Sequence, residues 1–151
     1  MNWIEYFKNL VNHVSLKSKD KNFKVGALIV GEDNAILSSG YNSFPRGIND
    51  GVDNRQIKPE KYYWIEHAER NAIFNAAKNG IKLDGAKIFL TSSYPCADCA
   101  RAIINCGIKT IYCYRSSGPY NEHWNKHYEV SKVMLEEAGV TIFFYEDSWN
   151  S

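Results

Sequence analysis

Two short motifs constrain what this chain can fold into. One has the form His-x-Glu at residues 67–69, and the other has the form Pro-Cys-x-x-Cys at residues 95–99. Together they offer one imidazole and two thiolates, which are zinc ligands, and a carboxylate that need not bind metal. A structural zinc site takes four protein ligands, whereas a catalytic site takes three and keeps its fourth position open. Because the sequence supplies no obvious fourth ligand, it predicts a catalytic Zn²⁺ site formed by His67, Cys96 and Cys99.

Each motif falls at the predicted start of a helix. Apolar residues recur with helical spacing over residues 67–79, and a second helix is predicted over roughly 96–106. Unpaired N–H groups give a helix N-terminus a partial positive charge, which favours a thiolate over a thiol. The i, i+3 spacing of the cysteines places both sulfur atoms on one face of their helix. We therefore expect the two helix N-termini to meet and to hold the metal between them.

Glu69 is the candidate catalytic residue. It stands two residues from His67, so its side chain points in a different direction and can face a water molecule rather than the metal. Zinc lowers the pKa of water in such sites to about 7. Glu69 is expected to take a proton from this water, to protonate a ring nitrogen of the substrate and to assist the loss of ammonia.

The rest of the chain predicts alternating helices and strands. Residues 2–16 predict an amphipathic helix, and residues 23–30 and 35–41 predict a hairpin of two strands. Residues 42–61 contain prolines and glycines without periodicity and predict a long, functional loop. Three further strands are predicted at 86–91, 110–115 and 140–145, and one further helix at 124–138. This order predicts an α/β fold, a three-layer α/β/α sandwich with a mixed five-stranded sheet.

Composition narrows the class of protein further. The chain has 151 residues, of which 44% are hydrophobic, and this predicts a single domain over residues 1–151. A net charge of +1, from 18 basic and 17 acidic residues, argues against a nucleic-acid partner. The sequence has no apolar run of bilayer length and no signal-peptide pattern, so no membrane partner is expected. Two of the four cysteines belong to the metal motif, which suits a reducing, cytoplasmic location.

Four segments carry a resemblance to a known family. They read Val-Gly-Ala-Leu-Ile-Val at 25–30, Gly-Tyr-Asn-Ser-Phe-Pro-Arg-Gly at 40–47, His-Ala-Glu-Arg-Asn-Ala-Ile at 67–73 and Pro-Cys-Ala-Asp-Cys-Ala at 95–100. The chain resembles the deoxycytidylate (dCMP) deaminases of the cytidine deaminase superfamily over residues 14–145. The pattern at 40–47 separates these enzymes from deaminases of free cytidine and of tRNA adenosine. The resemblance implies a cytidine deaminase-like fold, a Zn²⁺ cofactor and hydrolytic deamination of dCMP to dUMP.

The resemblance also implies substrate-binding residues. Asn42 is expected to hydrogen-bond the sugar. Arg46 is expected to bind a phosphate of the substrate or of an effector, with a solvated loop arginine as the alternative. The other residues expected to border the nucleotide adjoin the metal motifs or follow a predicted strand end, where ligands collect in open α/β sheets. They are Ala68, Thr91, Ser92, Ser93, Tyr94, Pro95, Tyr114, Arg115 and Tyr120.

The family also suggests partners. Many of its members respond to deoxynucleoside triphosphates, so dCTP and dTTP are candidate effectors beside the substrate dCMP. Shared active sites imply a homo-oligomer, a dimer or a hexamer. Family members commonly have Gly at the position of Ser43 and Cys at that of Glu66. The first departure weakens the expectation of effector regulation.

Several alternatives stay open from the sequence. The protein could act on dCTP as well as dCMP, or on another nucleobase, or it could be a non-catalytic module that zinc merely stabilises. His123 and His127 fit a surface or phosphate-facing pair better than a second metal site. The aromatic run at residues 62–64 fits packing against the adjoining helix better than a pocket wall or a subunit contact. Cys106 and Cys113 fit buried apolar positions.

Overall fold

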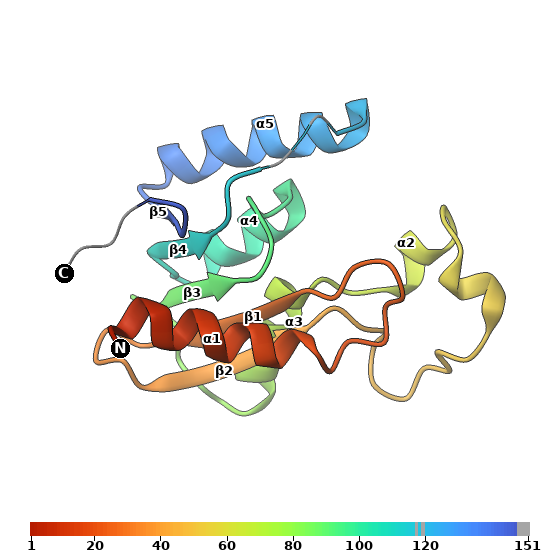
Figure 1. Cartoon of the computed structure of the whole chain (residues 1–151), viewed down its shortest axis with the longest axis horizontal. Coiled ribbons are helices and arrows are strands. Elements are labelled where there is room, and N and C mark those ends of the chain that lie inside the picture. The colour runs from red at the N-terminus through yellow and green to blue at the C-terminus, as the bar shows by residue number, and fades with distance from the viewer. Residues whose placement is uncertain (117, 119, 148–151) are drawn as a thin grey trace.

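The fold is built on one mixed sheet. The computed structural model describes residues 1–116, 118 and 120–147. Its strands lie in the order β2-β1-β3-β4-β5 (Figure 1), with β1 antiparallel to both of its neighbours and β3, β4 and β5 parallel to one another. The predicted mixed five-stranded sheet is therefore confirmed. The strand bounds are β1 (Gly26–Val30), β2 (Ile36–Tyr41), β3 (Lys87–Leu90), β4 (Thr110–Cys113) and β5 (Thr141–Phe144).

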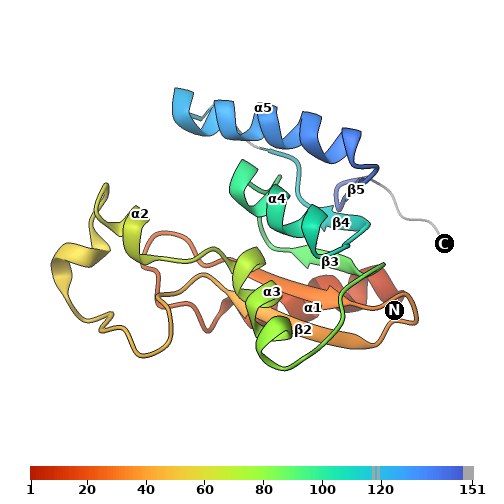
Figure 2. The same ribbon diagram turned by 180° about the vertical axis from the view of Figure 1, so that it is seen from behind.

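Helices cover both faces of the sheet, as the predicted three-layer sandwich requires. On one face lies α1 (Trp3–Ser15), whose Phe7 belongs to a core cluster with Leu28 and Phe89. Among the described residues, the other face carries three helices (Figure 2), two of which begin at the metal motifs. Over the part of the chain that the structure describes, no helix is both long and apolar enough to cross a membrane. The helices of this second face are α3 (Ala68–Lys78), α4 (Ala97–Asn105) and α5 (Glu122–Glu137).

The sequence of β1 is almost continuously apolar because helices cover the sheet on both faces of this strand. Successive side chains of a strand point to opposite faces of a sheet. Ala27 and Ile29 join the core beneath α3 and α4, whereas Leu28 and Val30 join the core beneath α1. All five residues of β1 are buried, as predicted for a strand covered on both faces.

The close approach of α3 to β2 depends on Gly40. A Cβ atom at Gly40 would lie 2.4 Å from the backbone nitrogen of Ala72 and 2.7 Å from the carbonyl oxygen of Ala68. Only a residue without a side chain allows the helix to pack this closely. His67 is the N-cap residue of α3, so this packing sets the position of its imidazole.

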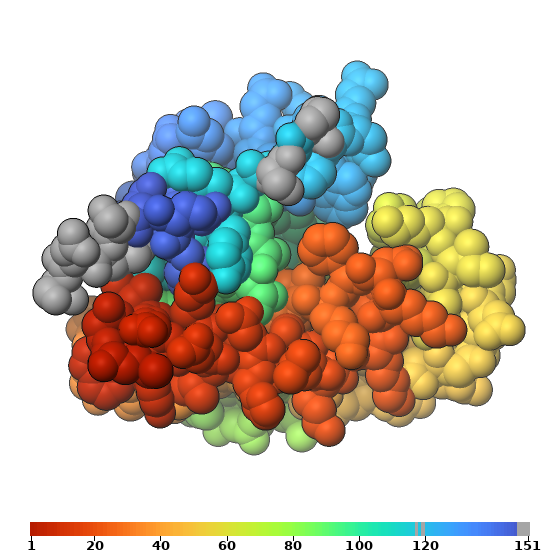
Figure 3. Space-filling view, viewed as in Figure 1, coloured from red at the N-terminus to blue at the C-terminus, as the bar shows by residue number. Residues whose placement is uncertain are grey.

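The segment between β2 and α3 is more structured than predicted. It contains a 3₁₀ turn at Asp53–Gln56 and the short helix α2 (Lys61–Trp64), so the prediction of a loop over 42–61 is only partly correct. A buried ion pair holds it to the turn after α1, because Lys61 Nζ lies 2.5 Å from the carboxylate of Asp20. Figure 3 shows the later part of this segment, in yellow, at one end of the molecule near the light-blue start of α5.

Two element boundaries differ from the prediction for local polar reasons. β1 begins at Gly26 rather than at residue 23, because the Asn42 side chain hydrogen-bonds the N–H of Val25 and the carbonyl of Phe23. α5 begins at Glu122 rather than at residue 124, because the side chain of Asn121 accepts the N–H of Trp124 at 3.0 Å. An asparagine at the N-cap supplies such an acceptor, so hydrophobic periodicity alone placed the start of this helix too late.

Candidate metal centre and active site

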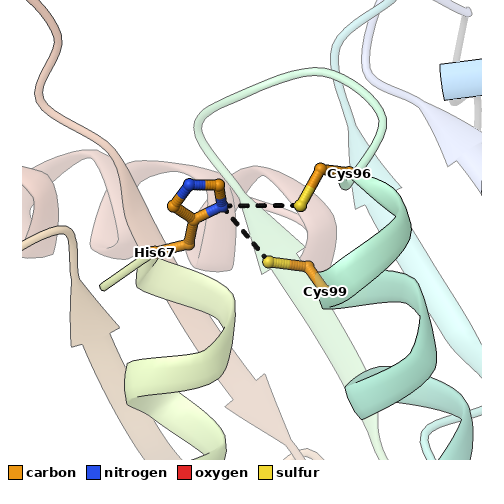
Figure 4. A group of neighbouring side chains, drawn as sticks. All are labelled: His67, Cys96 and Cys99. Carbon is orange, nitrogen blue, oxygen red and sulfur yellow. Dashed lines mark hydrogen bonds between the residues drawn. The ribbon is translucent and has the colours of Figure 1, made fainter. Parts of the chain in front are cut away.

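His67, Cys96 and Cys99 converge where α3 and α4 begin (Figure 4). His67 is the N-cap residue of α3, and Cys96 is the N-cap residue of α4. His67 Nδ1 lies 3.6 Å from Cys96 Sγ and 3.4 Å from Cys99 Sγ. Zn–N bonds of about 2.0 Å and Zn–S bonds of about 2.3 Å at a tetrahedral angle separate the two donor atoms by roughly 3.5 Å. The three donors therefore fit a zinc ion in both chemistry and spacing.

The two cysteines form a coupled thiol–thiolate pair. The hydrogen bond from the Cys99 thiol lowers the pKa of Cys96 to about 4, and the His67 ring adds to this effect against the cost of burial. The same hydrogen bond, together with burial, raises the pKa of the Cys99 thiol well above its usual value. The hydrogen bond to Cys96 also raises the pKa of His67. One thiolate therefore forms readily, and a cation at this point favours the second.

Glu69 lies beside these donors as the second residue of α3. Its side chain is buried, with 5% of the residue exposed. Burial raises the pKa of its carboxyl, and the neighbouring His67 offsets only part of that rise. A buried carboxyl with a raised pKa beside metal ligands is suited to accepting and releasing a proton. The catalytic role of Glu69 stays a prediction, which this burial and position support.

A cavity of about 280 Å³ opens beside the metal centre. Its wall includes His67 and Cys96, Tyr62 and Tyr63 of α2, and Trp124 of α5. The rings of Tyr62 and Trp124 lie 6.1 Å apart, and the Trp124 ring lies 6.5 Å from that of His67. Two segments that are distant in the sequence therefore place aromatic surface around the metal ligands.

This arrangement corrects the interpretation of the aromatic run at residues 62–64. Packing is the role of Trp64, whose Nε1–H donates to Glu60 at 3.0 Å and whose ring lies 3.9 Å from the guanidinium of Arg55. Tyr63, by contrast, is 84% exposed and lines the cavity with its neighbour. The run therefore serves both packing and the cavity wall.

The predicted base-binding residues adjoin the metal ligands along the chain. Ala68 is fully buried as the first residue of α3. In the segment 91–95, Thr91 Oγ1 accepts the N–H of Gly26 at 2.9 Å, and the carbonyl of Ser92 accepts a backbone N–H from beyond β4 at 3.0 Å. These bonds hold the segment as an extension of the sheet that leads into Cys96. Contact of these residues with a base stays a prediction.

Asn42 and Arg46 line a second cavity, of about 400 Å³, and Ile65 lines both this cavity and the first. The Asn42 amide accepts the N–H of Val25 at 2.9 Å and donates to the carbonyl of Phe23 at 2.7 Å. The guanidinium of Arg46 donates to an asparagine of α3 at 2.6 Å. Neither residue lines the cavity beside the metal ligands, and the two Asn42 hydrogen bonds hold the chain before β1.

Tyr94, Tyr114 and Arg115 lie with the C-terminal strand. The Tyr94 ring packs 5.9 Å from an aromatic ring of β5, and the Tyr114 ring lies 4.7 Å from that of Tyr145. Arg115 lies 2.5 Å from the carboxylate of Asp147. The structure does not bring these three side chains to the metal donors, so their assignment to the substrate stays a prediction without geometric support.

The start of α5 contributes side chains that the sequence did not assign to the site. Trp124 lines the cavity of the metal centre, and His127 Nδ1 accepts the N–H of Ala97 at 3.1 Å. Tyr120 lies just before this helix, with its ring 5.0 Å from that of Tyr128. The histidine spacing on a predicted helix was the available signal. The docking of that helix on α4 is a tertiary contact, which spacing does not report.

Comparison with known proteins agrees with this geometry. The family described as the cytidine and deoxycytidylate deaminase zinc-binding region matches residues 1–115, and the chain belongs to this family. An uncharacterized deaminase of Aliivibrio fischeri is 35% identical over 140 residues, covering 93% of this chain and 91% of the relative. The human deoxycytidylate deaminase is 35% identical over 147 residues, covering 94% of this chain and 79% of the relative.

A solved structure extends the agreement to the fold. The dCMP deaminase of the cyanophage S-TIM5, in complex with dCMP and dUMP, superposes with a TM-score of 0.73 at 27% identity. The match covers 93% of this chain and 94% of that chain. The predicted family, fold class, zinc cofactor and hydrolytic deaminase activity are therefore confirmed. The family match ends before α5, so the helix that carries His127 lies outside it.

Proposed function

We propose that this protein catalyses the hydrolytic deamination of dCMP to dUMP with release of ammonia. The observation that carries this proposal is the convergence of His67, Cys96 and Cys99 at two helix N-termini, with the buried carboxyl of Glu69 beside them. The relatives support dCMP as the substrate, because the human one is a deoxycytidylate deaminase and the cyanophage enzyme was solved with dCMP and dUMP. The reaction belongs to pyrimidine deoxynucleotide metabolism, in which dUMP feeds dTMP synthesis.

Four residues divide the chemistry between them. His67, Cys96 and Cys99 hold the zinc ion, whose Lewis acidity makes water nucleophilic near neutral pH. Glu69 takes the proton of the attacking water, gives it to the ring nitrogen beside the amino-bearing carbon, and then assists proton transfer to the departing amino group. The water oxygen becomes the new carbonyl oxygen of uracil, and the amino group leaves as ammonia. The raised pKa of Glu69 suits a carboxyl that must both accept and release a proton.

We assign recognition of the base to residues that adjoin the metal ligands along the chain, namely Ala68, Thr91, Ser92, Ser93 and Pro95. Their backbone positions are held by α3 and by the sheet, so they give a base a fixed wall. Asn42 and Arg46 are assigned to the sugar and phosphate end of a nucleotide through the second cavity. These two residues line the second cavity rather than the cavity beside the metal ligands.

The alternative occupant of the second cavity, in place of the substrate's phosphate, is a triphosphate effector, dCTP or dTTP. Lys17, Lys19 and Arg46 line this cavity, and a guanidinium suits bidentate phosphate binding. Two carboxylates also line it, that of Asp50, which pairs with Lys19, and that of Asp20, which pairs with Lys61. An effector bound here changes the rate of dCMP deamination at subsaturating substrate. Loss of that response in Lys17→Ala, with the unstimulated rate retained, supports the assignment, and an undiminished response in this variant contradicts it.

We also propose that residues 1–151 act as one deaminase domain within a homo-oligomer, a dimer or a hexamer. The basis is the resemblance to enzymes with shared active sites. Light scattering of the purified protein at working concentration measures the mass directly, and a monomeric mass contradicts this part of the proposal.

The substrate is tested by ultraviolet assay of deamination across cytidine, deoxycytidine, CMP, dCMP and dCTP. The proposal predicts the highest kcat/KM for dCMP. Equal kcat/KM for deoxycytidine would show that the enzyme does not read the phosphate, and comparable turnover of dCTP would identify a bifunctional dCMP/dCTP deaminase. Zinc-loaded protein that deaminates none of these compounds would indicate a non-catalytic module.

A further inference from the structure

The helix that carries the two cysteines begins with a cysteine, whose sulfur is only a weak hydrogen-bond acceptor. The first N–H groups of a helix lack intrahelical partners, and an Asn, Ser or Asp at the N-cap usually supplies an acceptor. α1 and α5 follow this rule, because Asn2 and Asn121 accept backbone N–H groups at 2.8 and 3.0 Å. The N-cap of α4 is Cys96, whose side chain makes no capping hydrogen bond within the described residues and whose sulfur faces the metal centre.

An acceptor for α4 comes from another helix. His127, in the second turn of α5, accepts the N–H of Ala97 at its Nδ1 atom, 3.1 Å away. Ala97 is the first residue of α4 and directly follows Cys96. Acceptance at Nδ1 fixes the neutral tautomer of His127 with its proton on Nε2. The imidazole therefore accepts an N–H group in the first turn of α4, as an asparagine does in the first turns of α1 and α5.

The first turn of α5 also lies beside His67, the metal ligand at the start of α3. The ring of Trp124 lies 5.4 Å from that of His127 and 6.5 Å from that of His67. α4 and α5 are directly packed against each other. The histidine is half-buried at this contact, so its ring orientation is set by packing rather than by solvent.

We propose that His127 is a positioning residue of the metal centre, which fixes the first turn of α4 and thereby the directions of the Cys96 and Cys99 sulfur atoms. This inference rests on the proposed zinc site. Partners that orient metal ligands commonly contribute 10- to 100-fold to metal affinity or activity. His127 would orient the cysteines through the backbone N–H of Ala97. This role requires an uncharged acceptor atom at the position of Nδ1.

A pair of isosteric substitutions tests the requirement for an acceptor. Asn and Leu both branch at Cγ and have the same number of side-chain heavy atoms, but only Asn carries an oxygen at the position of Nδ1. The release of zinc to an excess of a chromogenic chelator is measured for the zinc-loaded wild type, His127→Asn and His127→Leu. We expect His127→Leu to release zinc about 10-fold faster or more, and His127→Asn to stay within about threefold of the wild type. His13→Leu, on α1, is the matched control and keeps the wild-type release rate.

Steady-state kinetics separate positioning from substrate binding. The proposal expects kcat of His127→Leu to fall by about 10-fold, with the KM for dCMP within about twofold and with kcat largely restored in His127→Asn. Equal zinc release by the wild type and His127→Leu overturns the proposal. So does equally fast release by the Asn and Leu variants, since that result would mean that the imidazole acts as a ligand or by its bulk.

A measurement on the wild-type protein covers the case in which His127→Leu does not fold. In uniformly ¹⁵N-labelled holoenzyme, the bond predicts a detectable nitrogen–nitrogen coupling between the Ala97 amide and His127 Nδ1. Absence of that coupling, with both signals assigned, overturns the inference. Because zinc release and the coupling do not depend on substrate turnover, the inference can fail while dCMP deamination stands, and the reverse also holds.

Discussion

The two cavities of this protein are built in different ways. The ligands of the metal centre belong to the first turns of α3 and α4, whose alanine-rich faces are buried against the sheet. The second cavity is formed largely by the segment between β2 and α3 and by the turn after α1, which buried polar contacts hold together. Packing of regular elements therefore positions the chemistry, while ion pairs and hydrogen bonds shape the cavity assigned to phosphate.

This difference predicts two kinds of failure. A change at the metal centre removes chemistry and leaves the fold, because the helices pack through residues other than the ligands. A change at the second cavity alters stability, its dependence on pH, or substrate affinity, because buried charges hold that region in place. The predictions below run from the largest expected effect to the smallest.

Glu69→Gln gives the largest expected loss. The amide keeps the shape of the side chain but cannot move protons, so we expect kcat for dCMP to fall by about 10³-fold or more. Zinc content and thermal unfolding temperature should stay close to those of the wild type. Glu32→Gln, the same change at an exposed turn, is the matched control and keeps wild-type kcat. A Glu69→Gln variant with more than about a tenth of wild-type kcat would contradict the role of this residue in proton transfer.

Lys61→Met should cost stability rather than chemistry. It leaves the buried carboxylate of Asp20 without its partner, and breaking a buried ion pair costs about 3 kcal/mol. The free energy of unfolding in urea measures this loss. The control is Lys19→Met, which breaks an exposed ion pair with Asp50 and should cost about 0.5 kcal/mol or less. Equal losses in the two variants would mean that the buried pair does not hold the segment.

The same ion pair makes stability depend on pH. Burial alone raises the pKa of Asp20, but the Lys61 ammonium and the backbone N–H groups of Asn22 and Phe23 outweigh it and hold the pKa below its usual value. The stabilisation is therefore complete above the unfolded pKa of about 3.9 and is lost as the pH falls through the lower folded pKa. The difference in unfolding free energy between wild type and Asp20→Asn should shrink as the pH is lowered from 5 to 3. A difference that stays constant over this range would exclude the proposed linkage.

Arg46→Ala should have the smallest effect. The arginine is exposed and its guanidinium is already bonded to Asn75, so removing a phosphate contact at this surface should raise the KM for dCMP about three- to tenfold with little change in kcat. Deoxycytidine, which has no phosphate, serves as the control substrate. An equal increase of KM for both compounds would show that Arg46 does not contact the phosphate.

The helices and strands follow from local patterns, which is why most of the fold could be predicted from the sequence. Apolar spacing located α1 and α3 to within a residue or two, and the buried run of β1 indicated a strand covered on both faces. The errors fall where side chains bond to the backbone. The Asn42 amide hydrogen-bonds the backbone of residues 23 and 25, so these residues do not pair within the sheet. Hydrogen bonds between residues this far apart in the sequence are not indicated by local patterns.

Some features of the site also follow from local sequence motifs, whereas others depend on tertiary packing. The metal donors lie within short motifs at helix starts, so the spacing of His67, Cys96 and Cys99 was enough to predict their convergence. The bond from Ala97 to His127 depends on how α5 packs across α4, which no local pattern encodes. The separation of Arg46 from the metal centre likewise depends on the path of the segment that follows β2.

Removal and return of the metal test the central claim most directly. The apoenzyme is prepared by dialysis against a chelator, and dCMP deamination is followed by ultraviolet absorbance as Zn²⁺ is added back. The account predicts no activity without metal and full activity at one zinc per chain, with Cys99→Ser failing to recover under the same titration. Deamination by metal-free protein, or full recovery of Cys99→Ser at one zinc per chain, would contradict it.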